Sequence, residues 1–192
     1  MVAKLTGTCA LLVLLAAWGP ALGQDVSIRT ARDGEFVTIS ATAVMKVDPY
    51  VAWAVLSDYD HLAKFIPDMK SSRVVSREGN RLRVEQKGDV GFFFYKEPVN
   101  VLLEVHEEPP HRITARSIEG NVRQLETRYE LHSSGAATRL EYAGRFVPEF
   151  AIPPLIGMPF VNRVIERRFR AMVTEIQRRD ALARGAGKQP PK

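Results

Sequence analysis

One long amphipathic helix is expected near the end of the chain, after a series of short strands. Apolar residues recur at steps of three or four from Val161 to Ile176, with charged residues between them, so one side of this helix must be buried. The segments before it alternate between apolar and polar residues, which is the period of a strand with one buried face. A sheet and a single helix each have one apolar face to hide. The economical fold is therefore a curved antiparallel sheet wrapped around the helix.

About seven strands are expected in this sheet. The first runs from Glu35 to Val47, where Val37, Ile39 and Ala41 share one face. Turn signals such as Glu78-Gly79-Asn80 separate the later strands, and short connections between consecutive strands give an antiparallel meander. The later strands are predicted at residues 71–77, 81–88, 91–106, 112–119, 122–132 and 138–147.

Two short helices are expected between the first and second strands. Asp48 and Pro49 are signals for a helix start, and this helix should reach about Ser57. Asp58 is expected to cap the second helix, which Pro67 ends. A helix this short is unstable alone in water, so its apolar stripe must lie on something larger. The stripe consists of Tyr59, Leu62, Phe65 and Ile66, and we expect it to cover a cavity between the sheet and the long helix.

Residues 1–23 have the order of a secretory signal peptide, with Lys4 before an apolar run and small residues after it. The apolar run is shorter than the roughly 20 residues of a stable membrane-spanning helix, so cleavage is favoured over an uncleaved anchor, which stays an alternative. The predicted location is periplasmic or secreted. We expect residues 24–34 to be an N-terminal extension, 35–182 to be one ligand-binding domain, and 183–192 to be a basic flexible tail.

The cysteine content and the net charge indicate how the domain is stabilised and which partners are not expected. Cys9 is the only cysteine and lies in the predicted leader, so the mature domain would rely on its core rather than on disulfides. The formal net charge is +5, and much of the excess lies after Arg178, so a basic face for nucleic acid is not expected. The basic C-terminus and the Pro-rich segment "PEFAIPPLIGMPF" could together make transient contact with a membrane surface. A buried connector explains the Pro-rich segment equally well.

The stretch "VDPYVAWAVLSDYDHLAKFIPDMKSSRVV" resembles the helix–helix–strand signature of the START-like (SRPBCC) helix-grip superfamily. Within it, coenzyme-Q-binding and polyketide cyclase/dehydrase-like lipid-transport proteins look nearest, and the resemblance covers about residues 36–179. It implies an α+β helix-grip fold that binds a hydrophobic small molecule, such as a lipid, a quinone or a polyketide-like compound. The residues that carry the resemblance are Pro49, Trp53, Asp58, Tyr59, Phe65 and Pro67.

No catalytic, metal or cofactor motif stands out in the sequence. The stretch "DYDH" from Asp58 to His61 could bind a metal or act as an acid–base pair, but a helix start explains its acidic residues more simply. We therefore predict a binding or transport protein with no metal, no cofactor and no catalytic residue. The alternative is a cyclase, dehydratase or hydrolase that acts on an apolar substrate in the same cavity, with Tyr129, Tyr142 and Arg123 among the candidates.

The candidate ligand contacts come from the short second helix, the inward faces of the strands and the long helix. Aromatic residues in "GFFFYKEPV" project alternately to both faces of a strand, and core packing accounts for one pair of them. Tyrosines facing a cavity could orient a ligand carbonyl or hydroxyl, whereas in a packed core they would reach each other or Thr127. The predicted ligand-binding residues are Tyr59, Leu62, Phe65, Ile66, Phe92, Phe94, Arg123, Leu125, Tyr129, Tyr142, Phe146, Phe160, Ile165 and Phe169.

Overall fold

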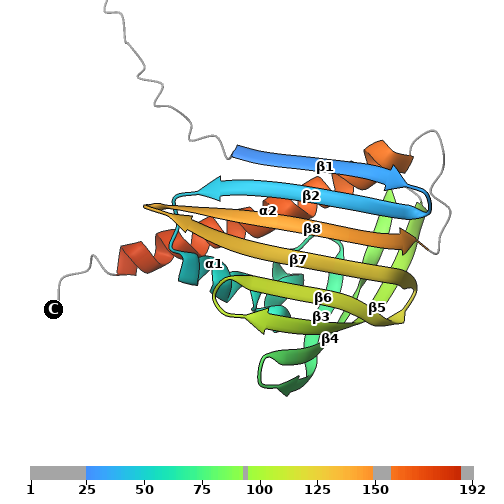
Figure 1. Cartoon of the computed structure of the whole chain (residues 1–192), viewed down its shortest axis with the longest axis horizontal. Helices are drawn as coiled ribbons and strands as arrows, with labels where there is room; N and C mark the ends of the chain where they lie inside the picture. Colours follow the sequence, from blue (N-terminus) through green and yellow to red (C-terminus); the bar gives the residue numbers. More distant parts are fainter. Residues whose placement is uncertain (1–24, 93–94, 149–156, 187–192) are drawn as a thin grey trace, which may run out of the picture.

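The computed structural model describes residues 25–92, 95–148 and 157–186. Within these ranges the chain forms a set of strands, two α-helices and one short 3₁₀ helix, η1 (Figure 1). The elements are β1 Asp25–Asp33, β2 Phe36–Met45, α1 Pro49–Leu56, η1 Tyr59–Lys64, β3 Met69–Glu78, β4 Arg81–Phe92, β5 Tyr95–Glu108, β6 Arg112–Gly120, β7 Val122–Ser134, β8 Ala137–Pro148 and α2 Gly157–Ala186.

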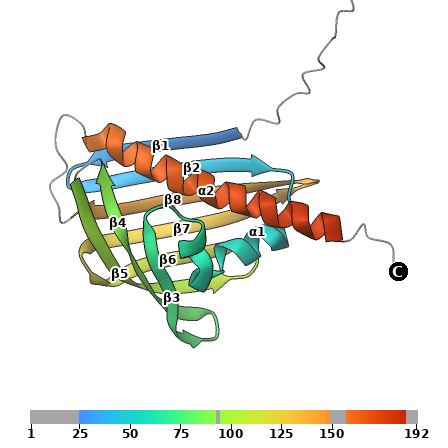
Figure 2. The same ribbon diagram turned by 180° about the vertical axis from the view of Figure 1, so that it is seen from behind.

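The strands form one eight-stranded antiparallel sheet in the order β1-β2-β8-β7-β6-β5-β4-β3. The path from β2 to β3 passes through α1 and η1 and carries the chain to the far edge of the sheet, after which the remaining strands follow one another back to β2. Helix α2 lies across one face of the curved sheet (Figure 2). The predicted helix-grip architecture is confirmed, with eight strands in place of about seven.

The additional strand is β1, in the segment expected to be an extension ahead of the domain. It pairs with β2 along its whole length, from Asp25 opposite Val44 to Asp33 opposite Phe36. Gly34, between the two strands, has a left-handed backbone conformation with φ of 60° and provides the tight turn. Of the β1 side chains, those of Val26 and Ile28 pack against the core. Only two apolar residues alternate in this segment, and so short an alternation does not distinguish a strand from an extended tail in the sequence.

Strand β4 passes through Gly88, where the sequence predicted a strand end. A Cβ atom at this position would lie 2.4 Å from the backbone oxygen of Asp68, so the glycine permits the close approach of the chain that enters β3. β4 therefore continues to Phe92, which is opposite Tyr95 of β5. The aromatic run expected on a single strand is divided between these two strands, and residues 93–94 lie outside the described ranges.

Helix α1 begins where the local signals place it, whereas α2 begins earlier than predicted. The Asp48 carboxylate accepts a hydrogen bond from the Tyr50 N–H at 2.7 Å at the start of α1, as predicted. Helix α2 begins at Gly157, before the first predicted apolar position, because Pro159 is tolerated in a first turn where its N–H would have no partner. It continues to Ala186, past the expected domain end. Residues 149–156 of the Pro-rich segment lie outside the described ranges.

Packing of α2 against the sheet is tight around Val173 and Ile176 and less complete nearer the start of the helix. Val173 and Ile176 are fully buried against the sheet and α1, whereas Ile165 and Arg168, earlier in the helix, are only half-buried. Each fully buried aliphatic side chain contributes about 1.5–3 kcal/mol, so Val173 and Ile176 are two of the contacts that hold α2 on the sheet. None of the described helices is long and apolar enough to span a membrane.

Candidate functional site

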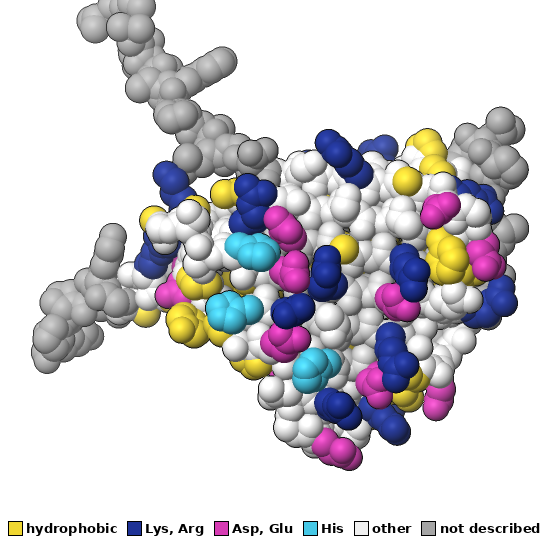
Figure 3. All heavy atoms as spheres, viewed as in Figure 1, with side chains coloured by type: hydrophobic (Ala, Val, Ile, Leu, Met, Phe, Trp, Pro, Cys, Tyr) yellow, Lys and Arg dark blue, Asp and Glu magenta, His cyan; other side chains and the backbone are white. Residues whose placement is uncertain are grey.

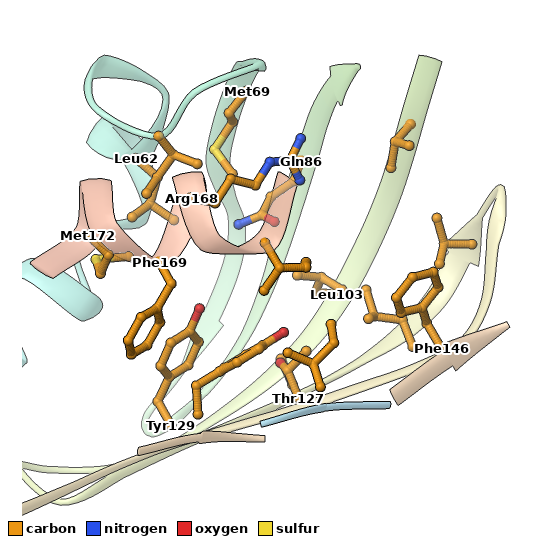
Figure 4. Close-up of a pocket in the computed structure, with 18 of the residues that line it drawn as sticks. Leu62, Met69, Gln86, Leu103, Thr127, Tyr129, Phe146, Arg168, Phe169 and Met172 are labelled. Atoms are coloured by element: carbon orange, nitrogen blue, oxygen red, sulfur yellow. The ribbon is translucent and has the colours of Figure 1, made fainter. Parts of the chain in front are cut away.

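A cavity of about 270 Å³ lies between the concave face of the sheet, η1 and the N-terminal half of α2 (Figure 4). Protein interiors have few voids larger than a water molecule, and small-molecule pockets begin at about 300 Å³, so a space of this size is a candidate binding site. It is lined by Ile39, Leu56, Tyr59, Leu62, Ile66, Met69, Val84, Gln86, Val90, Val99, Leu103, Val105, Ile113, Ala115, Val122, Leu125, Thr127, Tyr129, Tyr142, Phe146, Val161, Val164, Ile165, Arg168, Phe169 and Met172.

Two tyrosines on neighbouring strands form part of the cavity floor. Tyr129 of β7 is directly opposite Tyr142 of β8, and the centroids of their rings are 4.7 Å apart. The next inward position of β8 is Gly144, where a Cβ atom would lie 2.7 Å from the Tyr142 hydroxyl oxygen. This glycine leaves room for the Tyr142 ring to lie along the strand. The ring of Phe169, from α2, lies 6.4 Å from that of Tyr142 and bounds the cavity on the helix side.

A β-bulge in β7 turns Arg123 out of the cavity. The pairing of β7 with β8 shifts register between Arg123 and Glu126, and Gln124 between them has a φ of 50°. An extra residue in a strand resets its alternation, so Val122 becomes buried and lines the cavity while Arg123 becomes exposed. Arg123, expected as a ligand contact on an inward strand face, is therefore exposed and does not line the cavity.

The 3₁₀ helix η1 covers one end of the cavity and is tied to α2 by charged groups. Arg179 of α2 donates from Nη1 to Asp58 Oδ2 at 2.8 Å and from Nε to Glu175 Oε1 at 2.7 Å. The guanidinium carbon of Arg179 also lies 5.7 Å from the centroid of the Phe65 ring, within cation–π range. Phe65 is thus used to hold η1 against α2, whereas Tyr59 beside it lines the cavity.

Asp58 does not cap η1, contrary to the prediction. Its side chain makes no hydrogen bond to the first backbone N–H groups of the helix, and it instead accepts from Arg179 and lies 2.6 Å from His61 Nδ1. Burial disfavours the ionised carboxylate, but the hydrogen bonds from Arg179 and His61 outweigh it and hold the pKa of Asp58 below its usual value. Neither Asp58 nor His61 lines the cavity, so this pair fixes η1 in place at the rim.

Tyr59 carries a buried hydroxyl group near Glu107, a residue that does not line the cavity. Its hydroxyl oxygen is buried and has no hydrogen-bond partner within the described ranges, and the same holds for Glu107 Oε1. The second oxygen of Glu107 accepts from Arg77 Nη1 at 3.0 Å. Burial first, and then the charge of Glu107, raise the pKa of Tyr59, which keeps the phenol protonated. Buried polar atoms without partners mark places where a water molecule or a ligand atom completes the hydrogen bonding.

Arg168 is a cavity residue that the sequence analysis missed. Its Nη2 donates to the backbone oxygen of Asp89 at 3.0 Å, and its Nε is buried without a partner in the described part of the chain. Figure 4 shows it beside Gln86, on the opposite side of the cavity from Thr127 and Tyr129. Its position three residues after Ile165 is on the apolar stripe of the helix, and that spacing is the signal that could have identified it.

The structure brings most of the predicted ligand-binding residues to one cavity. Phe65 and Phe160 do not line it, the side chain of Phe92 and all of Phe94 lie outside what the structure describes, and Arg123 is exposed. A ligand role for the residues that do line the cavity stays a prediction. These residues are Tyr59, Leu62, Ile66, Leu125, Tyr129, Tyr142, Phe146, Ile165 and Phe169.

The outer face of the sheet carries interspersed basic, acidic and histidine side chains (Figure 3). One group there, Glu130, His132 and Glu141, has potential metal-ligand atoms that all lie within 4.8 Å of one another. Arg128 lies 3.7 Å from Glu130, and Arg139 lies 3.7 Å from Glu141. Because these cations balance the two carboxylates, the group has the character of surface ion pairs, and it does not line the cavity.

Several solved structures share this fold at low sequence identity. A protein from Thermus thermophilus is 20% identical with a TM-score of 0.61, over 76% of this chain and 98% of that chain. The Zhui aromatase/cyclase from a Streptomyces species is 18% identical with a TM-score of 0.61, over 73% and 91%. A STAR-related lipid transfer protein from Xanthomonas axonopodis is 14% identical with a TM-score of 0.61, over 83% and 96%. At these identities the similarity shows the fold alone.

Sequence comparison supplies the family. A search of curated proteins found no match. The family described as "Polyketide cyclase / dehydrase and lipid transport" matches residues 45–176. This range begins at the end of β2 and ends at the last fully buried residue of α2, so it includes η1 and most of the residues that enclose the cavity. The chain belongs to the polyketide cyclase/dehydrase and lipid transport family of START-like, helix-grip proteins.

Proposed function

We propose that this protein binds and carries one hydrophobic small molecule in the cavity between the sheet and α2. The observation that carries the proposal is the cavity of about 270 Å³ beneath the N-terminal half of α2, lined mainly by aliphatic and aromatic side chains. A ligand that hides about 200 Å² of apolar surface there would gain roughly 5 kcal/mol before the costs of binding. Lipids, quinones and polyketide-like compounds all have apolar surface of this kind.

Binding fits the polar groups of the cavity better than catalysis does. None of the described residues that line it is an aspartate, a glutamate or a histidine, which are the usual general bases. Burial raises the pKa of Tyr129 to about 12 and also raises that of Tyr142, so neither phenol is ionised at neutral pH. These hydroxyls can donate hydrogen bonds and orient a ligand. The family also contains cyclases and dehydrases, so catalysis on an apolar substrate is the outcome to test against.

Export is a further part of the proposal and rests on the leader-like order of residues 1–23. In that location the protein would take its ligand from a membrane or release it to one. The basic residues at the end of α2 and after it would favour an anionic surface. Detection of the cleaved chain in the periplasm or culture medium of its host would support this part, and recovery of an uncleaved chain from the cytoplasm would refute it.

Native mass spectrometry of protein purified from its own host tests ligand binding. The expected result is a mass above that of the chain alone, which organic extraction removes. Ala115→Phe fills the cavity and should abolish the added mass, because Ala115 lines it. Thr114→Phe, the neighbouring position on the other face of β6, is the matched control and should retain it. Repeated recovery of wild-type protein without any apolar ligand would refute the proposal.

A further inference from the structure

Arg168 places a cationic donor in a cavity lined mainly by apolar side chains. One of its nitrogen atoms, Nη2, is occupied by the backbone oxygen of Asp89 at 3.0 Å. Another, Nε, is buried and has no partner among the described residues. Arginine carries five donor hydrogens in a fixed planar arrangement, so the side chain retains capacity to bind an oxygen-bearing group. Because Arg168 lies on the cavity wall, an oxygen-bearing group can approach it from the cavity (Figure 4).

No described carboxylate forms an ion pair with Arg168. Asp68, the acidic residue whose charge acts on it most strongly, is paired with Arg167. The Asp89 carboxylate is paired with Lys70 at 2.7 Å and offers Arg168 only its backbone oxygen. Burial lowers the pKa of Arg168, and the charge of Asp68 partly offsets this. A guanidinium group nonetheless stays protonated in proteins, so a positive charge without a close counter-ion borders the cavity.

Two further donors lie within the electrostatic reach of this charge. The charge of Arg168 acts on the pKa values of both Tyr129 and Tyr142, although burial dominates and keeps both hydroxyls protonated. The two rings are in contact, with centroids 4.7 Å apart, and both line the same cavity as Arg168. The two phenols lie across the cavity from Arg168, so they can donate to other polar atoms of a ligand whose anionic group is at Arg168.

We propose that the ligand is an apolar molecule with one anionic oxygen group, such as a carboxylate, and that Arg168 binds this group. This inference rests on the proposed binding function and names the ligand class. An anion at the guanidinium group accepts a hydrogen bond and also neutralises its charge, whereas a neutral carbonyl or hydroxyl does only the first. The structure therefore favours an acid over an alcohol, an ester or a quinone of similar shape.

The test compares two probes that share a chain and differ in the head group, decanoic acid and decanol. The full chain, freed of bound lipid by organic extraction, is titrated with each by calorimetry at pH 7. We expect decanoate to bind about 10- to 100-fold more tightly than decanol, the ratio typical of a charged hydrogen bond in a partly buried site. The carboxyl signal of ¹³C-labelled decanoic acid, followed by NMR, should show that bound ligand stays ionised to a lower pH than it does in water.

Arg168→Met should remove most of this preference while it retains the apolar part of the side chain. Its decanoate affinity should fall about 10- to 100-fold, its decanol affinity should change less than about 3-fold, and the bound carboxyl should titrate above its value in water. Arg168→Lys keeps the charge and should lose less. Arg163→Met, an exposed arginine on the same helix that does not line the cavity, is the matched control and should bind like the wild type.

The outcomes separate this inference from the proposed function. Equal affinity of the wild type for decanoate and decanol would overturn the anion preference and leave apolar binding intact. That comparison needs no variant, so it decides the matter even if Arg168→Met does not fold. An Arg168→Met protein that keeps the full preference for decanoate would overturn the role of Arg168. Failure of the wild type to bind either probe would instead refute the binding function itself.

Discussion

Replacing Glu175 by Gln should make the stability of this protein less sensitive to acid. Glu175 lies on α2 and is 8% exposed. Its two oxygens accept hydrogen bonds from Arg178 Nε and Nη2, both at 2.7 Å, and from Arg179 Nε at 2.7 Å. The hydrogen bonds from Arg178, followed by that from Arg179, outweigh burial and lower the pKa of Glu175 to about 2. Through Arg179 the same carboxylate helps to hold Asp58 and η1 over the cavity.

The pKa of Glu175 sets both the sign and the size of the effect. Its value in the folded state, about 2, is below the ordinary value of 4.5, so the ionised carboxylate stabilises the native state above about pH 4.5. This contribution is lost as the pH falls from 4.5 towards 2. The full difference corresponds to about 3 kcal/mol, at about 1.4 kcal/mol per pH unit. Solvent screening around the exposed part of the network reduces the expected contribution to about 1–2 kcal/mol.

Urea denaturation between pH 7 and pH 3 measures this contribution directly. We expect Glu175→Gln to lower the free energy of unfolding by about 1–2 kcal/mol at pH 7 and by progressively less towards pH 3, because below about pH 4.5 the carboxylate of the unfolded wild-type chain takes up a proton that the folded chain does not. Glu166→Gln is the matched control, since its pair with Arg170 on the same helix is more exposed and should contribute less than about 0.5 kcal/mol. A gap between Glu175→Gln and the wild type that stays constant across this pH range would refute the reasoning.

Three further substitutions test the packing that surrounds the site. Gly144→Ala should destabilise the fold by about 1–3 kcal/mol in thermal unfolding, because its Cβ would lie 2.7 Å from the Tyr142 hydroxyl oxygen; Tyr142→Phe in the same chain should recover part of that loss, and a neutral effect would contradict the close contact. Asp180→Ala should cost about 1–3 kcal/mol by urea denaturation, because the buried carboxylate accepts from the Asp48 N–H at 2.9 Å; a cost below about 0.5 kcal/mol would mean that this contact is dispensable. Leu140→Ala, at a fully buried position, should cost about 2–5 kcal/mol, and a loss below 1 kcal/mol would show that the core there is loosely packed.

The sequence predicted the architecture well because local patterns report directly on secondary structure. Alternation from Val37 onward identified β2, Asp48 and Pro49 identified the start of α1, and the apolar stripe identified α2. The errors occurred where a local signal has two meanings. Gly88 was interpreted as the end of a strand, whereas it accommodates the backbone of Asp68, a contact between residues of different strands. No local pattern distinguishes these two uses of glycine.

The candidate site was also predictable only in part from the sequence. Alternation and helical spacing were sufficient to place Tyr129, Tyr142 and Phe169 on inward faces, because those periods follow from backbone geometry alone. The β-bulge that turns Arg123 outward is invisible in the sequence, since an inserted residue is recognised only by its pairing with the neighbouring strand. Because the bulge turns Arg123 outward, the cation that borders the cavity is Arg168 of α2 and not Arg123 of β7.

Periodicity in the sequence is enough to predict a curved sheet around one helix, because it leaves one apolar face on the sheet and one on the final helix, and these faces must meet. The three-dimensional packing shows that they meet incompletely. Side chains fill the interface at Ile176, whereas around Arg168 the helix and the curved sheet separate and leave a cavity of about 270 Å³. The volume between two curved surfaces depends on strand register, bulges and the position of the helix, which are long-range properties that no stretch of sequence encodes alone.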